Sequence, residues 1–285
     1  MSVVSERIGQ FFVEGNRLEF TEYGGGERHV VLLHGQMIPR RMHHHVARSL
    51  AEAGNHVITL DLLGHGRSDR PADPAAYSMT AFATQVVALL DHLGIDQAVV
   101  GGTSLGANVS LECAVLAPDR VRGLLVEMPV LENALHAGIV AFVPVMFAAR
   151  YLPFTVRLAR ALTRPVPRGL VPFWAGVVLD TFDQQPEAVA AMLHGVIFGR
   201  IAPPARQRCV ISVPALVIGH ARDVVHPLAD AQMLAEELPH ATFVTASSPL
   251  EWRMTPDRLT EAAVDFIDLC WAERVRPASG RVRRR

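Results

Sequence analysis

Short, continuous apolar runs alternate along this chain with segments whose apolar residues recur at helical spacing. A strand that is apolar at successive positions is buried on both faces, which happens when helices cover both sides of a parallel sheet. We therefore expect an α/β fold with a mostly parallel sheet and helices on both faces. The expected strands are residues 30–33, 57–60, 98–100, 124–126, 215–218 and 242–245, and the expected helices are residues 42–53, 80–93, 105–116, 230–238 and 256–269.

The alternation stops between about residues 131 and 208, a stretch with eight Pro and many aromatic residues. An insertion of this length between two sheet strands is usually a lid or cap over a ligand site. We expect residues 1–130 and 209–272 to form the core domain and residues 131–208 to form a helical cap. Residues 273–285 are rich in Arg, and we expect a disordered tail.

The distribution of charge argues against a nucleic-acid partner. All 27 basic residues are Arg, against 28 acidic residues, and the formal net charge is −1. Six of the Arg fall in residues 274–285, which leaves 21 Arg against 28 acidic residues in the rest of the chain. A nucleic-acid-binding body is expected to be basic, and this one is acidic. The absence of Lys also excludes Schiff-base chemistry and a phosphate-binding loop lysine.

The distribution of cysteine and of apolar residues predicts a cytoplasmic protein. The three Cys are widely spaced, which is typical of reduced thiols, and the N-terminus lacks the apolar region of a signal peptide. The longest uncharged run, residues 133–149, contains Pro144 and falls short of the ~20 residues that span a bilayer. We expect no transmembrane segment; a buried or lid segment is favoured over a peripheral membrane contact.

No metal or cofactor is expected. Residues 43–45 are three consecutive His, but successive helical side chains point about 100° apart, so they cannot converge on one ion. We interpret them as polar residues on a helix surface. No glycine-rich nucleotide motif follows a predicted strand, and the sequence does not indicate an oligomeric state.

The strongest chemical signal is the G-x-S-x-G pattern of residues 102–106, which follows one predicted strand directly and opens a helix. A sharp strand-to-helix turn holds the serine in a strained conformation, so the Ser104 hydroxyl projects above the sheet. The flanking glycines let strand and helix approach closely. The helix N-terminus then offers free N–H groups to a developing oxyanion.

Two further loops follow predicted strands. After residues 30–33 comes His34-Gly35-Gln36, where the Gln36 N–H can donate to an oxyanion while the His34 side chain bonds neighbouring loops. Residues 61–68, D-L-L-G-H-G-R-S, combine turn glycines with Asp and Ser partners. We interpret this second loop as a rigid scaffold rather than as part of the chemistry.

In order and spacing, these motifs resemble the α/β-hydrolase superfamily. The segment 213–223, V-P-A-L-V-I-G-H-A-R-D, resembles the family's strand and loop that carry the triad acid. The resemblance covers about residues 11 to 269, and the family places its cap where residues 131–208 lie. It implies an α/β-hydrolase fold, with Ser104 as nucleophile, Leu105 and Gln36 N–H as the oxyanion hole, and Asp223 as the acid.

The triad histidine is absent from the family's usual place after the last strand. Residues 247–253 read S-S-P-L-E-W-R there, and the last histidine of the chain, His240, precedes that strand. A serine without a base is a poor nucleophile. One hypothesis places the base at His226, three residues after Asp223 on the same loop.

A second hypothesis uses a carboxylate base, either Glu127 after its strand or Glu251 after the last strand. An ion pair of Glu251 with Arg253 or Arg258 and a loop-anchoring role for Glu127 are the simpler interpretations. We expect a hydrolase that cleaves a small, apolar ester, thioester or lactone through an acyl-enzyme on Ser104. The alternative is a non-hydrolytic or ligand-binding protein with a degenerate triad.

Overall fold

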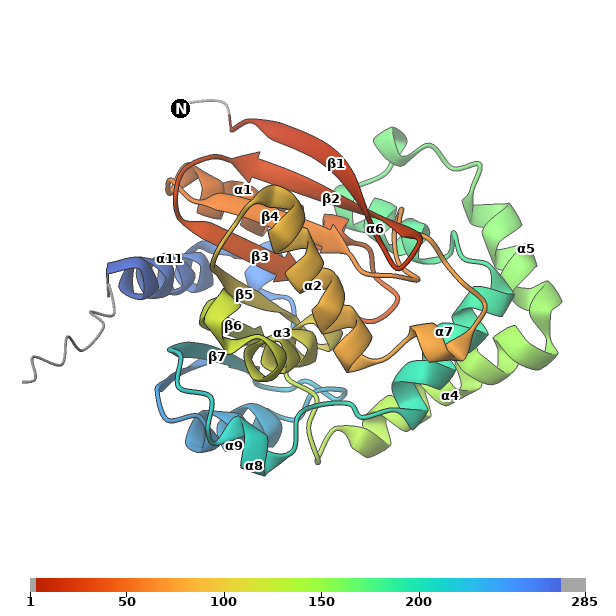
Figure 1. Ribbon diagram of the computed structural model, residues 1–285. Helices are drawn as coiled ribbons and strands as arrows, with labels where there is room; N and C mark the ends of the chain where they lie inside the picture. Colours follow the sequence, from red (N-terminus) through yellow and green to blue (C-terminus); the bar gives the residue numbers. More distant parts are fainter. Residues whose placement is uncertain (1–3, 273–285) are drawn as a thin grey trace, which may run out of the picture.

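The computed structural model describes residues 4–272, and within them it contains one eight-stranded sheet (Figure 1). The strand order is β1-β2-β4-β3-β5-β6-β7-β8. Strands β3 to β8 run parallel to one another, whereas β1 and β2 pair antiparallel with their neighbours. The bounds are β1 Glu6–Val13, β2 Asn16–Gly24, β3 His29–Leu33, β4 His56–Asp61, β5 Ala98–Thr103, β6 Val121–Glu127, β7 Ala215–His220 and β8 Ala241–Ala246.

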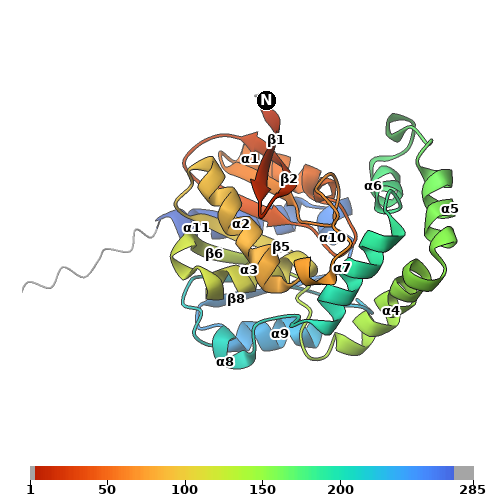
Figure 2. The ribbon, with the colours of Figure 1, turned by 45° about the vertical axis from the view of Figure 1, so that its right-hand side comes forward.

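Helices cover both faces of the sheet, as the apolar runs predict. On one face lie α1 (His44–Glu52) and α11 (Asp257–Ala272), and on the other lie α2 (Met79–Leu93), α3 (Leu105–Leu116) and α9 (Leu228–Glu237) (Figure 2). In β3, Val30 and Leu32 belong to the hydrophobic core under α1 and α11, whereas Val31 and Leu33 belong to the core under α2, α3 and α9. The predicted α/β fold is confirmed, and the predicted ends of these elements differ from the observed ones by at most three residues.

The apolar pattern of the sequence does not predict the first two strands, β1 and β2. In β1 only Phe11 is fully buried, so no continuous apolar run marks the strand. Glu14 and Gly15 both adopt positive φ and close a two-residue turn between β1 and β2. Such a hairpin adds an antiparallel edge to an otherwise parallel sheet.

Residues 131–208 lie between β6 and β7 and contain no strand; we call them the insertion. Figure 2 shows most of their helices standing beside the sheet rather than on its faces. Buried Asp230 of α9 accepts hydrogen bonds from the backbone N–H groups of Leu131, Asn133 and Ala134, which fixes the start of the insertion on the core. Its helices are α4 Leu135–Tyr151, α5 Pro153–Thr163, α6 Phe173–Thr181, α7 Pro186–Phe198 and α8 Ala205–Arg208.

Within residues 4–272 no single helix is long and apolar enough to cross a membrane. The pair α4 and α5 reaches that apolar length only when both helices are counted, and they meet at a bend of 98°.

Candidate active site

Ser104 occupies the sharp turn between β5 and α3, as the G-x-S-x-G pattern predicts. Its φ of 56° and ψ of −111° lie in a region that non-glycine residues rarely adopt. A Cβ on either Gly102 or Gly106 would overlap the carbonyl oxygen of Leu33 in the neighbouring strand. The two glycines therefore permit the close approach that lifts the serine above the sheet edge.

The structure brings Ser104, His226 and Asp223 into one hydrogen-bonded chain. The Ser104 Oγ lies 2.9 Å from His226 Nε2, and His226 Nδ1 lies 2.9 Å from an Asp223 carboxylate oxygen. The N–H of Nδ1 donates to the carboxylate, which leaves Nε2 to accept the serine proton. Both residues of the His–Asp pair come from the loop between β7 and α9, whereas Ser104 is 122 residues away in the sequence.

The tight turn of this loop lets one short segment supply both groups. Arg222 adopts a φ of 66°, and the second carboxylate oxygen of Asp223 accepts the backbone N–H groups of Val225 and His226. Burial raises the pKa of Asp223, but the hydrogen bonds from His226 and Val225 outweigh that effect and hold its pKa below the usual value. The carboxylate therefore stays ionised and keeps the imidazole in the tautomer described above.

Two backbone N–H groups beside Ser104 have no hydrogen-bond acceptor among the described residues. One belongs to Leu105, the first residue of α3, and the other to Gln36 in the loop after β3. A turn positions the second group: Ile38 N–H donates to the Gly35 carbonyl, and Met37 adopts a φ of 64°. Unbonded N–H groups at a helix N-terminus can stabilise a developing oxyanion.

Two apolar cavities meet at Ser104. One, of about 450 Å³, runs toward α4 and α7 and includes Leu135, Phe142 and Leu193. The other, of about 410 Å³, runs toward α6 and the loop after β8. Five residues line both cavities: Gln36, Ser104, Phe142, Val225 and His226.

The Gln36 side chain is a polar group facing these apolar walls. Its Oε1 and Nε2 are buried and have no hydrogen-bond partner within the described residues. An unpartnered amide in a cavity beside a nucleophile is a group that a substrate can satisfy.

Glu127, one of the carboxylates considered as a base, is fully committed to other contacts. Its carboxylate accepts hydrogen bonds from both terminal nitrogens of Arg253, from the Thr103 hydroxyl at 2.5 Å and from His220 Nε2 at 3.0 Å. Burial raises its pKa, but the Arg253 charge and these hydrogen bonds bring the pKa well below the usual value. Its own backbone carbonyl accepts the Ser104 N–H at 2.9 Å, so Glu127 also holds the strand-to-helix turn at Ser104 in place.

The other candidate carboxylate, Glu251, forms a local cap. It accepts the N–H and the hydroxyl of Ser247 and bonds Arg258. Its pKa is lowered because these hydrogen bonds outweigh desolvation. The expected pairing of Glu251 with Arg258 is present, whereas Arg253 pairs with Glu127 instead.

The segment where the family carries its histidine has a structural use here. The carbonyl oxygen of Ser248 lies 2.6 Å from Nδ1 of His220, the residue that ends β7. With Arg253 this ties the loop after β8 to the ends of three strands. The sequence analysis gave His220 no role and considered Arg253 only as a partner of Glu251. The available signal was a histidine at the end of one apolar run and an arginine in the loop after the last one.

The remaining motif residues act as scaffold. His34 Nε2 accepts the Leu62 N–H at 3.0 Å and its Nδ1 donates to the Gly35 carbonyl, which links two loops. Asp61 accepts the backbone N–H groups of Arg40 and Arg67. Within residues 4–272 no cluster of three or more His, Cys, Asp or Glu could hold a metal.

The prediction of a polar, surface-facing His43 was wrong. Its side chain is buried, and Nε2 donates to the Leu33 carbonyl at 3.0 Å. Burial, followed by the Arg253 charge, lowers its pKa to about 4. A helical wheel could not show this because His43 ends a 3₁₀ turn, Arg40–His43, that precedes α1.

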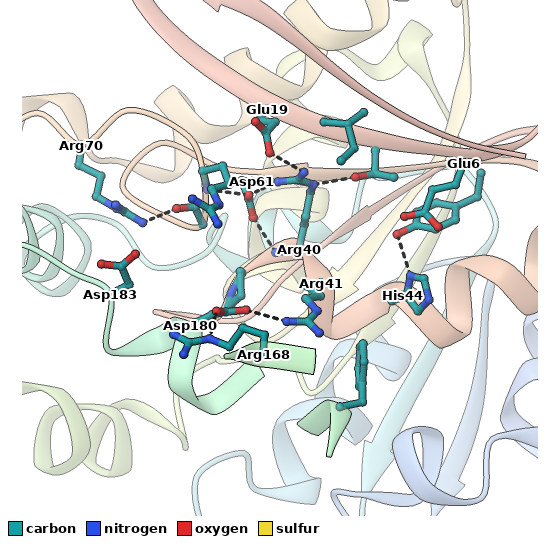
Figure 3. A pocket seen from close by; sticks show the side chains of 17 residues that line it. Glu6, Glu19, Arg40, Arg41, His44, Asp61, Arg70, Arg168, Asp180 and Asp183 are labelled. Carbon is teal, nitrogen blue, oxygen red and sulfur yellow. Dashed lines mark hydrogen bonds and ion pairs between the residues drawn. The ribbon is translucent and has the colours of Figure 1, made fainter. Parts of the chain in front are cut away.

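A third cavity, of about 570 Å³, is lined by charged side chains and lies away from Ser104 (Figure 3). Several of its charges are paired: Asp61 with Arg40, and Asp180 of α6 with Arg41 and Arg168. The Arg41–Asp180 ion pair joins the core to the insertion. This ion pair therefore helps to hold the insertion on the core.

Comparisons with known proteins agree with this geometry. The model of the α/β-hydrolase fold family matches residues 28–249. The chain is 31% identical to 3-oxoadipate enol-lactonase 2 of Acinetobacter baylyi over 66% of this chain and 68% of that protein. It is 33% identical to the haloalkane dehalogenase of Mycolicibacterium paratuberculosis, but that match covers only 44% of this chain and 41% of the relative.

Solved structures show the same architecture. The enol-lactonase from Burkholderia xenovorans superposes with a TM-score of 0.75 at 23% identity, over 91% of this chain and 100% of that chain. A thermophilic esterase from Thermogutta terrifontis gives a TM-score of 0.73 at 23% identity, over 94% of this chain and 99% of the esterase chain. The family match, extending over most of the chain, shows that this protein belongs to the α/β-hydrolase family and is a hydrolase.

Proposed function

We propose that this protein hydrolyses small, apolar, uncharged esters, thioesters or lactones through an acyl-enzyme on Ser104. The observation that supports this most directly is the continuous chain from Ser104 Oγ through His226 to Asp223, with both distances at 2.9 Å. The similar lactonase and esterase add support, since both act on acyl–oxygen bonds by name.

In the proposed reaction, the Ser104 oxygen attacks the substrate carbonyl while His226 Nε2 takes the serine proton. Leu105 and Gln36 N–H stabilise the oxyanion, and a donor of this kind contributes about 2.7–4 kcal/mol. Collapse breaks the acyl–oxygen bond, and His226 returns the proton to the leaving alcohol. Water, activated by the same imidazole, then releases the acid and regenerates the serine.

The two cavities at Ser104 support a substrate with an apolar group on each side of the scissile bond. We propose that one cavity holds the acyl group and the other the alcohol, or that a lactone ring extends across both. Among residues 4–272, Arg253 carries the only guanidinium in the walls and Glu127 neutralises it, so this part of the chain offers a carboxylate no spare guanidinium at the site. The unpartnered Gln36 amide suits a single polar substituent near the ester.

We further propose that the insertion, residues 131–208, acts as the cap of this site. Its helices α4, α6 and α7 supply apolar walls to the two cavities, including Phe142, Trp174 and Leu193. Apolar walls exclude water and favour an apolar substrate.

The test combines active-site labelling with turnover. A fluorophosphonate should label Ser104, as located by mass spectrometry, and the protein should turn over p-nitrophenyl butyrate. We expect His226→Ala to lower kcat/KM by about 10²–10⁴-fold, because it removes the general base. Asp223→Asn should also lower kcat/KM steeply, since it disturbs the tautomer of the imidazole.

His240→Ala is the matched control, because this exposed histidine lies before β8 and makes no contact with Ser104. Its kcat/KM should equal that of the wild type. An unlabelled Ser104 in a folded protein would instead favour the ligand-binding alternative, and full activity of His226→Ala would show that another group is the base.

A further inference from the structure

Helices α4 and α5 expose an unusual amount of apolar surface. The last residues of α4, the bend and one side of α5 carry six large side chains that are each at least half exposed. Figure 2 places both helices at the outer edge of the molecule, beyond α7. We call these six residues the α4–α5 face: Phe147 53%, Tyr151 68%, Leu152 51%, Phe154 62%, Leu158 55% and Leu162 68%.

The face is continuous because of helical spacing. Phe154, Leu158 and Leu162 are four residues apart and form one stripe along α5. The opposite side of α4 is also apolar, since Met146 and Ala149 are buried. A helix at a protein surface normally has a charged outer side, and α4 has only one charged residue in 17. Apolar patches of this kind mark interaction sites.

The charges that α4 and α5 themselves carry are all positive, and the carboxylates that reach these helices, Glu187 and Asp183, are already paired with Arg. Residues 133–179 contain five Arg and no Asp or Glu. Arg157, Arg160 and Arg168 form ion pairs with acidic side chains of α6, α7 and the loop between them. Arg150 and Arg164 form no ion pair within residues 4–272. An apolar stripe flanked by Arg is complementary to a negatively charged lipid surface.

We infer that the α4–α5 face docks on the surface of an anionic membrane, with Phe147, Phe154, Leu158 and Leu162 entering the headgroup region. The bend of 98° between the helices keeps the pair from spanning a bilayer as one rod, so the contact lies in the interface.

A second copy of this chain is a poorer occupant of the same face. A twofold contact would bring the same patch from both copies together. Arg150 and Arg164 of each copy would then approach Arg of the other, and the carboxylates at this face, Glu187 and Asp183, are already paired with Arg157 and Arg160. Like charges across an interface oppose association.

Helix α4 carries part of the docked face and also forms a wall of the active-site cavity, and this part of the inference rests on the proposed function. Ile139 and Phe142 of α4 line the cavity that reaches Ser104, on the same helix that would lie against the lipid. Docking would therefore hold the wall of the cavity next to the lipid, where an ester dissolved in the membrane is concentrated. The substrate class is accordingly a lipophilic ester held in a membrane.

The test is flotation of the full-length protein with vesicles of phosphatidylcholine, with and without phosphatidylglycerol. We expect binding that strengthens with phosphatidylglycerol and weakens with salt. The triple variant Phe154→Ser, Leu158→Ser and Leu162→Ser should bind at least about tenfold more weakly, because it removes the stripe of α5. The matched control replaces three exposed apolar residues outside the insertion: Leu116→Ser, Val210→Ser and Leu269→Ser.

A second variant, Arg150→Glu with Arg164→Glu, keeps the test decisive if the triple variant does not fold, and it should also weaken binding to the anionic vesicles. Vesicle binding that survives both variants would overturn the inference and assign binding to another part of the chain, such as the Arg-rich residues 274–285. If the wild type does not bind vesicles but forms a dimer that the triple variant abolishes, the membrane inference is overturned and a second copy of the chain is the occupant of the face.

The readout does not depend on catalysis. Ser104→Ala should bind vesicles as the wild type does. Failure of the proposed function would appear as lost turnover of soluble p-nitrophenyl butyrate with vesicle binding intact. Failure of the docking inference would appear as the reverse.

Discussion

Removal of Arg253 should cost far more stability than an ordinary surface substitution. The Glu127 carboxylate is 1% exposed, and Arg253 supplies two of its hydrogen bonds and its only guanidinium partner within residues 4–272. The variant Arg253→Met fills the space with an apolar chain but leaves that carboxylate buried beside Thr103 and His220. Breaking a buried pair by removing one partner costs about 3–5 kcal/mol, a large part of the roughly 5–15 kcal/mol that stabilises a domain.

The assay is urea unfolding of four proteins: wild type, Arg253→Met, Glu127→Gln and the double variant. We expect Arg253→Met to lose about 3–5 kcal/mol, and the double variant to recover part of this loss because no buried charge remains. The coupling energy between the two sites should reach about 2 kcal/mol. Labelling of Ser104 should also slow in Arg253→Met, since the Glu127 backbone carbonyl holds the Ser104 N–H.

The pH dependence provides an independent check. The folded-state pKa of Glu127 is depressed, so its stabilising contribution is present above the unfolded carboxyl pKa of about 4.3 and is lost as pH falls through the folded value. In Arg253→Met that contribution is missing, so wild type and variant should differ less in stability below about pH 4. A loss under about 1 kcal/mol for Arg253→Met at pH 7, or strictly additive single variants, would refute this reasoning.

Three further predictions concern single residues. Gly106→Ala should destabilise the protein by about 1–3 kcal/mol and block labelling of Ser104, because the new Cβ would overlap the Leu33 carbonyl oxygen. An unchanged free energy of unfolding in urea would contradict this. The pKa of His43 is lowered from 6.5 to about 4, so neutral His43 stabilises the fold fully above pH 6.5 and this stabilisation is lost as pH falls to about 4. The free energies of unfolding of wild type and His43→Gln, measured in urea, should therefore approach each other by about 3 kcal/mol over that window, and a constant difference would exclude the assignment. Gln36→Leu should raise the free energy of unfolding by about 1–3 kcal/mol, because the substitution removes two buried polar atoms without a partner, and kcat/KM for p-nitrophenyl butyrate should fall severalfold. A variant less stable than the wild type would contradict this prediction.

Local sequence patterns predicted most of the fold and the serine. The strand of residues 98–100 and the glycines around Ser104 are adjacent in the chain, so their contacts follow from spacing alone. The sheet could be predicted because its parallel strands are apolar on both faces. The hairpin of β1 and β2 could not, because it is an edge with only one face buried and its strands show no such run.

The sequence limited the candidates for the base, and the tertiary structure supports His226 among them. The absence of histidine after His240 excluded the family's usual position, but Glu127, Glu251 and His226 all remained open. Only the folded chain places Nε2 of His226 at 2.9 Å from Ser104 and engages both carboxylates elsewhere.

The sequence by itself determined the layered α/β architecture and the strand-to-helix turn at Ser104, because both depend on neighbouring residues or on the apolar pattern of each strand. The candidate acid Asp223 followed from the family resemblance of residues 213–223. The tertiary structure decided which histidine meets the serine, that Arg253 neutralises Glu127, and that the outer side of α4 and α5 stays uncovered. Those outcomes depend on contacts between residues over a hundred positions apart, and on exposure, and neither is encoded in any local pattern.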